Sequence, residues 1–453
     1  MAETFNDLKL SNWIVEQCNA LSIYKPTPIQ SNCIPHILAG EDCIGCAKTG
    51  SGKTLAFVLP MLEKLFEDPY GIFGLVITPT RELAQQIAEQ FLVIGNCMNL
   101  ELSLIVGGLN MVKQGHEMFK KPHIIVATPG RLADHIESCN TFSLSKVKFL
   151  VLDEADRLLG GEYDNHLKVI FDSLPKKKQI LMFSATLTDT LQEVQKVTSN
   201  KVFVYVAPST VATVEQLKQY YILCPNHVKD GYLVQVVRQF RAKNPQGNIM
   251  IFTDTCLNCQ LLSMMFNSIG IKNVRLHGMM RQRERFAALA TFKSNVIKIL
   301  IATDVAARGL DIPTVELVIN HSIPMNPKIY IHRVGRTARA GRGGTSISLV
   351  APQDVKKVHA IEDLTGVKLE EQTVDDSKVL EILAQIKVTK RSAEIEMEES
   401  NFNERKLINK RKHMIEEGLD PDLEELAEKK KLKKEKREKR KKQKSKKNYV
   451  KND

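Results

Sequence analysis

The segment from Ala47 to Thr54 has the residue types and the spacing needed to bind the phosphates of a nucleotide. It reads AKTGSGKT, follows an apolar run at 42–46 that predicts a buried strand, and precedes a run at 55–59 that predicts the start of a helix. In that setting the two glycines let successive backbone N–H groups point at one anion, and the helix N-terminus adds positive charge. The first position of the usual G-x-x-x-x-G-K-S/T pattern is alanine here. A glycine-rich turn without a ligand is the alternative, but Gly-Lys-Thr between a strand and a helix favours nucleotide binding.

Every residue of this loop is expected to contact the nucleotide: Ala47, Lys48, Thr49, Gly50, Ser51, Gly52, Lys53 and Thr54. The Lys53 ammonium would reach the β- and γ-phosphates, and the Thr54 hydroxyl would bind Mg²⁺. Lys53 is therefore predicted to serve in catalysis as well as in binding.

The second group of chemical interest is the carboxylate pair Asp153 and Glu154, at the end of an apolar run at 147–152 that predicts a strand. Asp153 could hold Mg²⁺ directly or through water, and Glu154 could orient and deprotonate a water that attacks the γ-phosphate. Positive charge for the transition state could come from Arg336 and Arg339, which share one face if the segment is helical. A solvated basic helix is the alternative, and the phosphate loop upstream favours arginine fingers.

These side chains need elements that bring them together, and the chain alternates strands with helices. In the first half, predicted strands at 74–78, 102–106, 123–127, 147–152 and 179–183 end in clusters of polar residues. Continuous apolar strands of this kind predict a parallel sheet with both faces covered, which binds ligands at the carboxyl ends of its strands. The pattern restarts at 248–252, 274–277, 297–302, 315–320 and 345–350 without a second phosphate loop. The second sheet is therefore expected to meet the nucleotide from the other side.

This pattern predicts an α/β chain with two tandem doubly wound domains and a basic C-terminal extension. We divide it into a first domain at 1–205, a linker at 206–216, a second domain at 217–355, a charged helical extension at 356–428 and a disordered lysine-rich tail at 429–453. Beyond about residue 394 the sequence is too polar to predict a good core.

Composition limits the location and the partners of the protein. No run of roughly 18 apolar residues occurs, so no membrane helix is expected, and the acidic start lacks the core of a signal peptide. An intracellular protein with reduced cysteines is predicted. Two C-x-x-C pairs, Cys43/Cys46 and Cys256/Cys259, could suggest zinc, but packing roles for buried cysteines are favoured.

The positive charge is concentrated at the C-terminal end. Residues 429–453 hold 15 Lys or Arg and 3 Asp or Glu, which leaves 49 basic and 49 acidic residues in the rest of the chain. A nucleic-acid groove in the neutral body must therefore be a local arrangement of charge, while the tail is a general polycation.

The motifs together resemble those of the DEAD-box ATP-dependent RNA helicases over about residues 5–352. They occur in the family's order: the glutamine motif ending at Gln30, AKTGSGKT, PTREL at 79–83, Gly107-Gly108, TPGR at 128–131, DEAD at 153–156, SAT at 184–186, IFT at 251–253, HGMMRQRER at 277–285, ATDVAARGLD at 302–311 and HRVGRTAR at 332–339. One such motif is a weak signal, whereas eleven in order are specific. The chain departs from the pattern at Ser22-Ile23, where Gly-Phe is usual, and at Asp254, where many members carry Asn.

The resemblance implies two RecA-like domains with ATP and Mg²⁺ in the cleft between them. It assigns adenine contact to Phe5 and Gln30, ribose contact to Asp311, and γ-phosphate contact to Arg336 and Arg339. It assigns RNA-backbone contacts to Pro79, Thr80, Arg81, Gly108, Thr128, Arg131, Gln282, Arg285 and Thr303. Ser184 and Thr186 would couple hydrolysis to unwinding. A glutamine amide also suits adenine chemically, because it can donate and accept in one plane.

The expected function is ATP-dependent unwinding of RNA or remodelling of RNA–protein complexes, by a monomeric core with little sequence preference. Details of the motifs and the lysine-rich tail look most similar to nucleolar members of the family that act in ribosome assembly, so pre-ribosomal RNA, pre-ribosomal proteins and a nucleolar location are expected. An ATP-gated RNA clamp that rarely unwinds and a DNA helicase are the alternatives. A GTPase is disfavoured because the guanine signature N-K-x-D does not occur.

Overall fold

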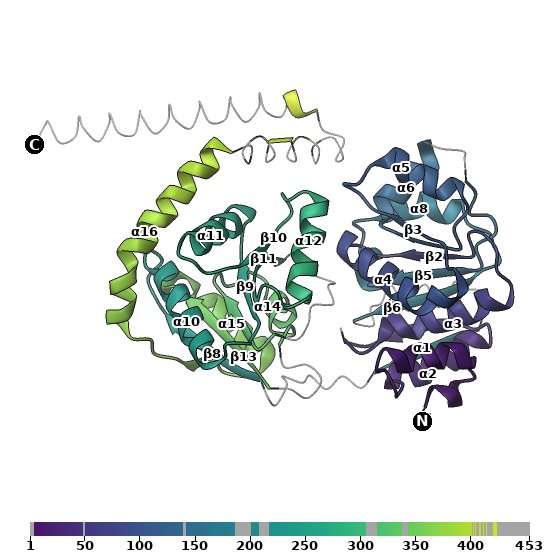
Figure 1. Ribbon diagram of the computed structural model, residues 1–453, viewed down its shortest axis with the longest axis horizontal. Helices are drawn as coiled ribbons and strands as arrows, with labels where there is room; N and C mark the ends of the chain where they lie inside the picture. Colours follow the sequence, from purple (N-terminus) through teal and green to yellow (C-terminus); the bar gives the residue numbers. More distant parts are fainter. Residues whose placement is uncertain are drawn as a thin grey trace, which may run out of the picture.

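The computed structural model describes residues 4–48, 50–138, 142–185, 201–207, 217–304, 315–337 and 343–400, together with residues 402, 404, 407–408, 411, 414 and 420–423. Within them the chain forms two separate parallel sheets, each flanked by helices (Figure 1). The predicted fold of two tandem α/β domains is therefore confirmed. The predicted tail at 429–453 lies outside the described residues.

The first sheet has seven strands in the order β3-β4-β2-β5-β6-β1-β7, and every pairing is parallel. The elements of this part are η1 (Phe5–Leu8), α1 (Asn12–Ala20), α2 (Pro28–Leu38), β1 (Asp42–Cys46), α3 (Lys53–Glu67), β2 (Gly74–Ile77), α4 (Arg81–Ile94), η2 (Gly95–Met98), β3 (Leu102–Ile105), α5 (Met111–Phe119), β4 (Ile124–Ala127), α6 (Pro129–Ser138), β5 (Phe149–Asp153), α7 (Ala155–Leu158), α8 (Asp164–Asp172), β6 (Gln179–Ser184) and β7 (Val202–Val206).

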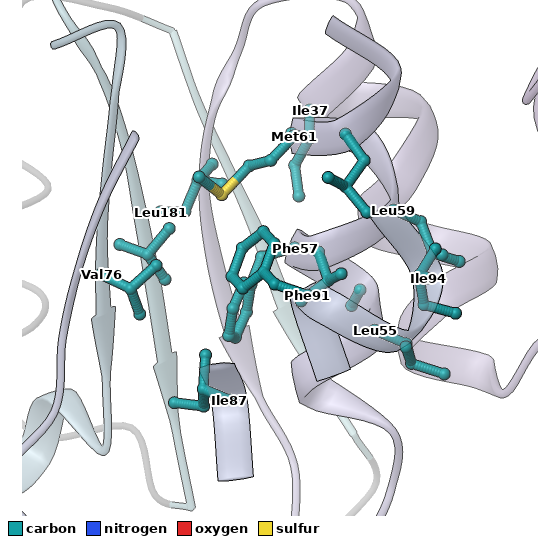
Figure 2. Close-up of a cluster of buried hydrophobic side chains, with 14 of the residues drawn as sticks. Ile37, Leu55, Phe57, Leu59, Met61, Val76, Ile87, Phe91, Ile94 and Leu181 are labelled. Atoms are coloured by element: carbon teal, nitrogen blue, oxygen red, sulfur yellow. The ribbon is translucent and has the colours of Figure 1, made fainter. Parts of the chain in front are cut away.

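Alternate residues of these strands supply two hydrophobic cores, because successive side chains point to opposite faces of a sheet. Val76 of β2 packs with α3 and α4, among side chains that include Phe57 and Phe91 (Figure 2). Its neighbours Leu75 and Ile77 join a second core with α5, α6 and α8. Both faces of the sheet are therefore covered, as its continuous apolar strands predict.

The C-x-x-C pair on β1 follows the same alternation. Cys43 belongs to the core with α3 and α4, and Cys46 belongs to the core on the other face of the sheet. The two thiols therefore point away from each other.

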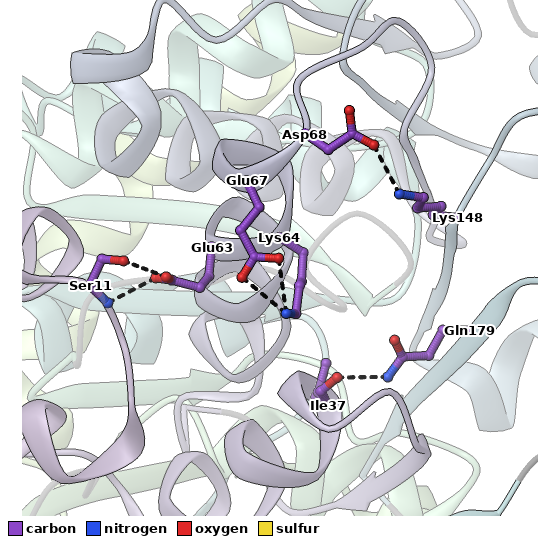
Figure 3. Close-up of polar contacts among 8 residues, drawn as sticks. All are labelled: Ser11, Ile37, Glu63, Lys64, Glu67, Asp68, Lys148 and Gln179. Atoms are coloured by element: carbon purple, nitrogen blue, oxygen red, sulfur yellow. Dashed lines mark hydrogen bonds and ion pairs between the residues drawn. The ribbon is translucent and has the colours of Figure 1, made fainter.

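Figure 3 shows how the N-terminal segment is attached to α3: the backbone N–H of Ser11 donates to Glu63 Oε2 at 2.9 Å.

The second sheet also has seven strands, in the order β10-β11-β9-β12-β13-β8-β14, again with parallel pairings only. Its elements are β8 (Leu217–Leu223), α10 (Lys229–Lys243), β9 (Ile249–Thr253), α11 (Cys256–Ser268), β10 (Val274–Leu276), α12 (Gln282–Lys293), β11 (Ile299–Thr303), β12 (Leu317–Asn320), α14 (Pro327–Val334), β13 (Gly344–Val350), η3 (Pro352–Asp354), α15 (Val355–Thr365), β14 (Glu370–Glu371) and α16 (Asp376–Glu399).

The structure differs from the sequence-based expectation at the edges of both sheets. β7 pairs with β1 along its whole length, although no strand is predicted between the one at 179–183 and the linker. β14 pairs with β8, so the second sheet extends beyond residue 355. Residues 208–216, most of the predicted linker, lie outside the described residues. The two edge strands differ in their local signal. β7 reads VFVYV, a residue pattern that favours a strand and that the prediction overlooked, whereas β14 reads EE and becomes a strand only through its pairing with β8.

The C-terminal extension adds a long helix to the second domain. α16 lies along α10 and α11 (Figure 1), and its residues Ala393 and Met397 pack with Leu261 of α11 and with Phe402. The expectation of no good core beyond residue 394 is therefore wrong at Met397 and Phe402. Among the described helices, none is long and apolar enough to cross a membrane.

Candidate active site and RNA-binding surface

The phosphate loop joins β1 to α3, as its sequence predicts. Gly50 and Gly52 have φ angles of 80° and 91°, a left-handed conformation that side chains other than glycine rarely adopt. Lys53 opens α3, and its ammonium donates to the carbonyl of Ala47 at 2.5 Å, across the curl of the loop. Lys48 and Ser51 lie in the same turn, Thr54 is the second residue of α3, and Thr49 lies outside the described residues. The loop thus has the curled backbone that phosphate binding requires.

Gln30 connects the glutamine motif to this loop. Its side chain is 1% exposed, its Oε1 accepts from the Thr27 N–H at 2.9 Å, and its Nε2 donates to the Gly52 carbonyl at 3.0 Å. A Cβ built on Gly52 would lie 2.4 Å from Gln30 Nε2, so only glycine fits there. Phe5 is buried in the core that also holds α2 and α3. Contact of Gln30 and Phe5 with adenine stays a prediction.

The departure from Gly-Phe at Ser22-Ile23 has a visible consequence. Ser22 adopts a φ of 61°, the left-handed region that suits the usual glycine. Ile23 packs against the core in place of the larger phenylalanine. The turn that precedes the glutamine motif is therefore kept, with a small backbone strain at Ser22.

The carboxylate pair lies at the carboxyl end of β5. Asp153 Oδ1 accepts from the N–H of Glu154 at 3.1 Å, and Glu154 adopts a φ of 52° as the N-cap of α7. Burial raises the pKa of Asp153 to about 7, with the ammonium of Lys53 opposing the rise. Burial also raises the pKa of Glu154, opposed first by Arg157, whose Nη1 lies 3.5 Å from Glu154 Oε2. A carboxylate whose pKa is raised in this way is suited to accept a proton near neutral pH.

A cavity of about 540 Å³ brings both domains to these carboxylates. Its lining includes Lys53, Asp153 and Glu154 from the first domain and Arg336 from the second. Arg336 is 4% exposed and follows the end of α14, and its charge also opposes the raised pKa of Glu154. The predicted arginine finger is thus placed at the phosphate loop. Arg339 and the predicted ribose contact Asp311 lie outside the described residues.

The donors expected for Mg²⁺ suit a hard cation that keeps part of its hydration. Thr54 and Asp153 both line the cavity and present hydroxyl and carboxylate oxygens. No group of three or more His, Cys, Asp or Glu that could hold a metal occurs among the described residues. One carboxylate plus a hydroxyl, completed by nucleotide phosphates and water, is the usual form of a nucleotide-dependent Mg²⁺ site.

The predicted RNA contacts of the first domain lie at the same edge of the sheet. Thr80 caps α4 by accepting from the Leu83 N–H at 3.3 Å. Gly108 has a φ of 81°, and a Cβ built on it would lie 2.8 Å from the Arg81 guanidinium. Arg131 donates to the Leu109 carbonyl at 3.0 Å. Pro79 and Thr128 are buried where α4 and α6 begin. The structure groups these residues, and their contact with RNA stays a prediction.

Glu82 joins the predicted RNA contacts of the two domains and is not among the predicted site residues. Its Oε1 accepts from Gln282 Nε2 at 2.7 Å and lies 2.9 Å from Arg285 Nε. Its side chain is 4% exposed. Thr303, the remaining predicted contact of the second domain, is buried at the end of β11. The acidic residue inside PTREL was the available signal in the sequence, because a carboxylate among residues that are predicted to bind phosphate favours a nearby cation.

A buried arginine, also absent from the prediction, orients Arg336. Arg333 donates through Nε and Nη2 to the two carboxylate oxygens of Asp304 at 2.5 and 2.7 Å, and through Nη1 to Asn320 and to the Ser322 carbonyl. These bonds fix α14 to the ends of β11 and β12. Because Arg336 follows α14 by two residues, they also position it at the cavity.

The coupling motif lies at the end of β6, beside β1. Ser184 is buried, its carbonyl accepts from the Ala47 N–H at 3.1 Å, and Ala185 lines the cavity. The segment is therefore in direct contact with the phosphate loop. Thr186 lies outside the described residues.

Asp254, the other departure from the family pattern, has a local partner. Its Oδ1 accepts from Asn258 Nδ2 at 2.8 Å, and this hydrogen bond and nearby backbone N–H groups outweigh burial and lower its pKa. The bond joins the end of β9 to the first turn of α11.

Known proteins show the same sequence pattern and the same architecture. The profile described as DEAD/DEAH box helicase matches residues 27–194, and the helicase conserved C-terminal domain matches residues 229–341. The human protein named probable ATP-dependent RNA helicase DDX49 is 57% identical over 93% of this chain and 88% of its own length. The Candida albicans ATP-dependent RNA helicase DBP8 is 46% identical over 91% and 96%, respectively.

The structure of S. cerevisiae Dbp5 bound to RNA and ADP BeF3 superimposes with a TM-score of 0.72 at 29% identity, and the match covers 86% of this chain and 100% of that chain. Both sheets are therefore those of tandem RecA-like domains. With the matched profiles and relatives, this architecture shows that the chain belongs to the DEAD-box family of ATP-dependent RNA helicases.

Proposed function

We propose that this RNA helicase closes its two domains over ATP and RNA together and acts on pre-ribosomal RNA in the nucleolus. The observation that carries the closing step is the shared cavity, where Arg336 of the second domain lines the same space as Lys53, Asp153 and Glu154 of the first. Neither domain alone holds the lysine, the water-positioning carboxylate and the arginine finger that phosphoryl transfer uses. Hydrolysis therefore requires the closed arrangement.

Each residue has a defined task in the proposed reaction. Lys53 would bind the β- and γ-phosphates, and Thr54 and Asp153 would hold a Mg²⁺ ion, which would neutralise phosphate charge. Glu154 accepts a proton from the attacking water, for which its raised pKa is suited. Arg336 stabilises the charge that develops on the transferred phosphoryl group. After hydrolysis the cleft loses this set of contacts and reopens.

RNA favours closure because its predicted contacts come from both domains. Glu82 already joins Gln282 and Arg285 to α4, so the two predicted RNA surfaces are held next to each other. A bound strand must follow this joined surface, and a rigid duplex cannot follow a bend without losing base pairs. Contacts to the backbone carry no direct sequence information, so little sequence preference is expected.

The Arg336→Ala variant tests closure. We expect the RNA-stimulated rate of ATP hydrolysis to fall by about 10³–10⁵, the range seen for arginine fingers, while ATP binding to the first domain persists. The matched control is Arg238→Ala, which removes an exposed arginine of α10. Normal turnover in Arg336→Ala would contradict the proposed arrangement. Strand separation of a short RNA duplex by the wild-type protein then decides between unwinding and clamping.

The ribosomal assignment is supported by the similarity of the motifs to nucleolar members of the family and by the lysine-rich tail. A cluster of this kind also suits nuclear import. Crosslinking in cells followed by sequencing of the bound RNA tests the assignment. Enrichment of ribosomal RNA precursors is expected, and enrichment of messenger RNA alone would reject it.

A further inference from the structure

The first domain has a second cavity at the amino ends of its strands, whereas the phosphate loop lies at their carboxyl ends. It measures about 570 Å³ and is lined by residues 70–72, 121, 143, 145–148, 175 and 177. These segments directly precede β2, β4, β5 and β6. In a parallel sheet the amino ends of all strands share one edge, so this cavity and the ATP cleft lie at opposite edges. A ligand here would leave the cleft free.

Lysines dominate the lining of this cavity. Lys121, Lys146, Lys148 and Lys177 all contribute to it, all four are exposed, and no Asp or Glu lines it. Lys148 forms an ion pair with Asp68 at 3.2 Å (Figure 3). Among the described residues, the other three lysines have no ion pair. Since the chain without its tail has no net charge, this basic cavity is a local concentration of positive charge.

Packed loops and rings form the walls of the basic cavity. The Tyr70 hydroxyl donates to the Lys146 carbonyl at 3.0 Å, and the Tyr70 ring meets Phe73 edge-on at 5.4 Å. The ammonium of Lys148 lies over both rings, at 5.3 and 5.7 Å from their centroids. A Cβ built on Gly71 would lie 2.4 Å from the Lys121 carbonyl, so the loops that hold Tyr70 and Lys121 are in direct contact. The backbone segments that carry Lys121, Lys146 and Lys148 are therefore held in place by these contacts.

We propose that the basic cavity is a second RNA-binding surface, which holds the phosphate backbone of RNA segments outside the cleft. Phosphate contacts by lysine supply most non-specific affinity for nucleic acids. Ser143 and Ser145 also line the cavity. The Ser143 hydroxyl donates to Ser145 Oγ at 2.9 Å, which leaves the Ser145 hydroxyl to donate to a phosphate oxygen. RNA is favoured over an acidic protein segment because, as proposed above, the helicase binds RNA at its cleft, and a long substrate then brings further phosphates close to the first domain. An RNA bound here would stay attached when the cleft opens after hydrolysis.

The test compares RNA affinity by length and by salt for the full chain. The triple variant Lys121→Gln, Lys146→Gln and Lys177→Gln replaces each ammonium with a neutral polar amide and removes three charges. Its control, Lys218→Gln, Lys243→Gln and Lys272→Gln, removes three exposed charges from the second domain. The probes are single-stranded RNAs of about 10 nucleotides, within the range of one groove, and about 40 nucleotides. Fluorescence anisotropy over a salt series gives the affinity and its salt slope.

The cavity variant should bind the long RNA more weakly at low salt, and the slope of log affinity against log salt should flatten by about 2, since each phosphate contact on a single strand contributes about 0.7. The control variant should keep the wild-type slope. Affinity for the short RNA and ATPase stimulation by it should be unchanged, which also shows that the variant is folded. Lys→Arg substitution at the same positions should retain the wild-type slope.

Two results would overturn the proposal. The first is an unchanged slope on the long RNA, which would mean that these lysines meet no phosphate. The second is a loss of binding to a polyglutamate peptide with RNA binding unchanged, which would identify the cavity as a site for an acidic protein. Neither result bears on the proposed closing of the cleft. The Arg336→Ala variant and the ATPase assay with short RNA test that closing separately.

Discussion

Glu154 combines an unusual backbone with a buried carboxylate. Its φ of 52° places it in the left-handed region, where a residue other than glycine is strained by roughly 1 kcal/mol or more. The conformation lets the chain turn at once from β5 into α7 and leaves the carboxylate in the cavity lining. Strain at such a position is consistent with a catalytic role for this side chain.

Replacing Glu154 with Gln should separate hydrolysis from binding. The amide keeps the size of the side chain and cannot accept the proton of the attacking water, so the hydrolysis rate should fall by about 10²–10⁴. ATP and RNA should still bind, and the closed state should accumulate. Lys53→Ala is the contrasting variant, because it removes a phosphate contact and should lose ATP affinity. The ATP hydrolysis rate and the nucleotide affinity should be measured for both variants. Near-normal hydrolysis in Glu154→Gln would show that Glu154 does not accept the proton of the attacking water.

Burial of His277 predicts that the stability of the second domain depends on pH. Burial, with the nearby charges of Arg275 and Arg285, lowers its pKa from 6.5 to about 4. Between these two pH values the His277 imidazole is protonated in the unfolded chain and neutral in the folded chain. Protonation therefore favours the unfolded state, and the free energy of unfolding decreases as pH falls. The stabilisation is complete above pH 6.5 and is lost as pH falls toward 4, by up to about 3 kcal/mol.

The His277→Gln variant should therefore lose less stability than the wild type between pH 7 and pH 4. Glutamine has no proton to gain, and its amide can still meet Gln260, whose Oε1 lies 3.1 Å from His277 Nε2. Urea unfolding at a series of pH values measures the difference. His359→Gln, on the exposed surface of α15, is the control. Parallel pH profiles for wild type and His277→Gln would show that His277 does not titrate during unfolding.

At the scale of elements, α16 is a structural part of the second domain. The Tyr232 hydroxyl donates to Asp376 at 2.6 Å near its start, and the ammonium of Lys390 donates to Asp230 at 2.5 Å farther along. At its end, Phe402 lies against the His277 ring at 6.2 Å between ring centroids and packs near Met279. The extension thus supports the segment that leads to Gln282, a predicted RNA contact.

The Phe402→Ala variant should weaken this support. A buried phenylalanine replaced by alanine costs about 3 kcal/mol, and the ring is 9% exposed here. We expect a lower urea midpoint, together with a higher RNA concentration for half-maximal ATPase because the 277–282 segment loses a neighbour. Phe402→Leu should recover most of both. Val388→Ala, at an exposed site of α16, serves as control. An unchanged midpoint in Phe402→Ala would mean that this end of the extension contributes no stability.

At the scale of the whole molecule, the uneven charge predicts a role for the tail at 429–453, which lies outside the described residues. Its 15 basic and 3 acidic residues make it a polycation joined to a neutral body. Deleting it should weaken RNA binding at low salt and flatten the salt dependence, because fewer counterions are released. The maximal ATPase rate at saturating RNA should hardly change, since the reacting groups lie in the cleft. Equal salt slopes for full-length and truncated protein would show that the tail does not bind RNA.

The sequence alone determined those features that depend on neighbours along the chain. The bounds of β1 and the phosphate loop follow from an apolar run, two glycines and a helix start, all within 20 residues. The order of the motifs identified the family, because each motif is a short local string that can be read without knowing the fold. The carboxylates of β5 were found in the same way, since parallel strands bring their carboxyl ends to one edge.

Only the tertiary structure decided which distant residues meet. The pairing of Glu82 with Gln282 spans 200 positions, and the bond from Arg333 to Asp304 joins two motifs that sequence reasoning treats separately. β14 and Phe402 have weak local signals, and they acquire their structure from a neighbouring strand or a packed helix. Local patterns encode elements, whereas contacts between elements depend on how whole surfaces fit, and no single stretch of sequence contains that information.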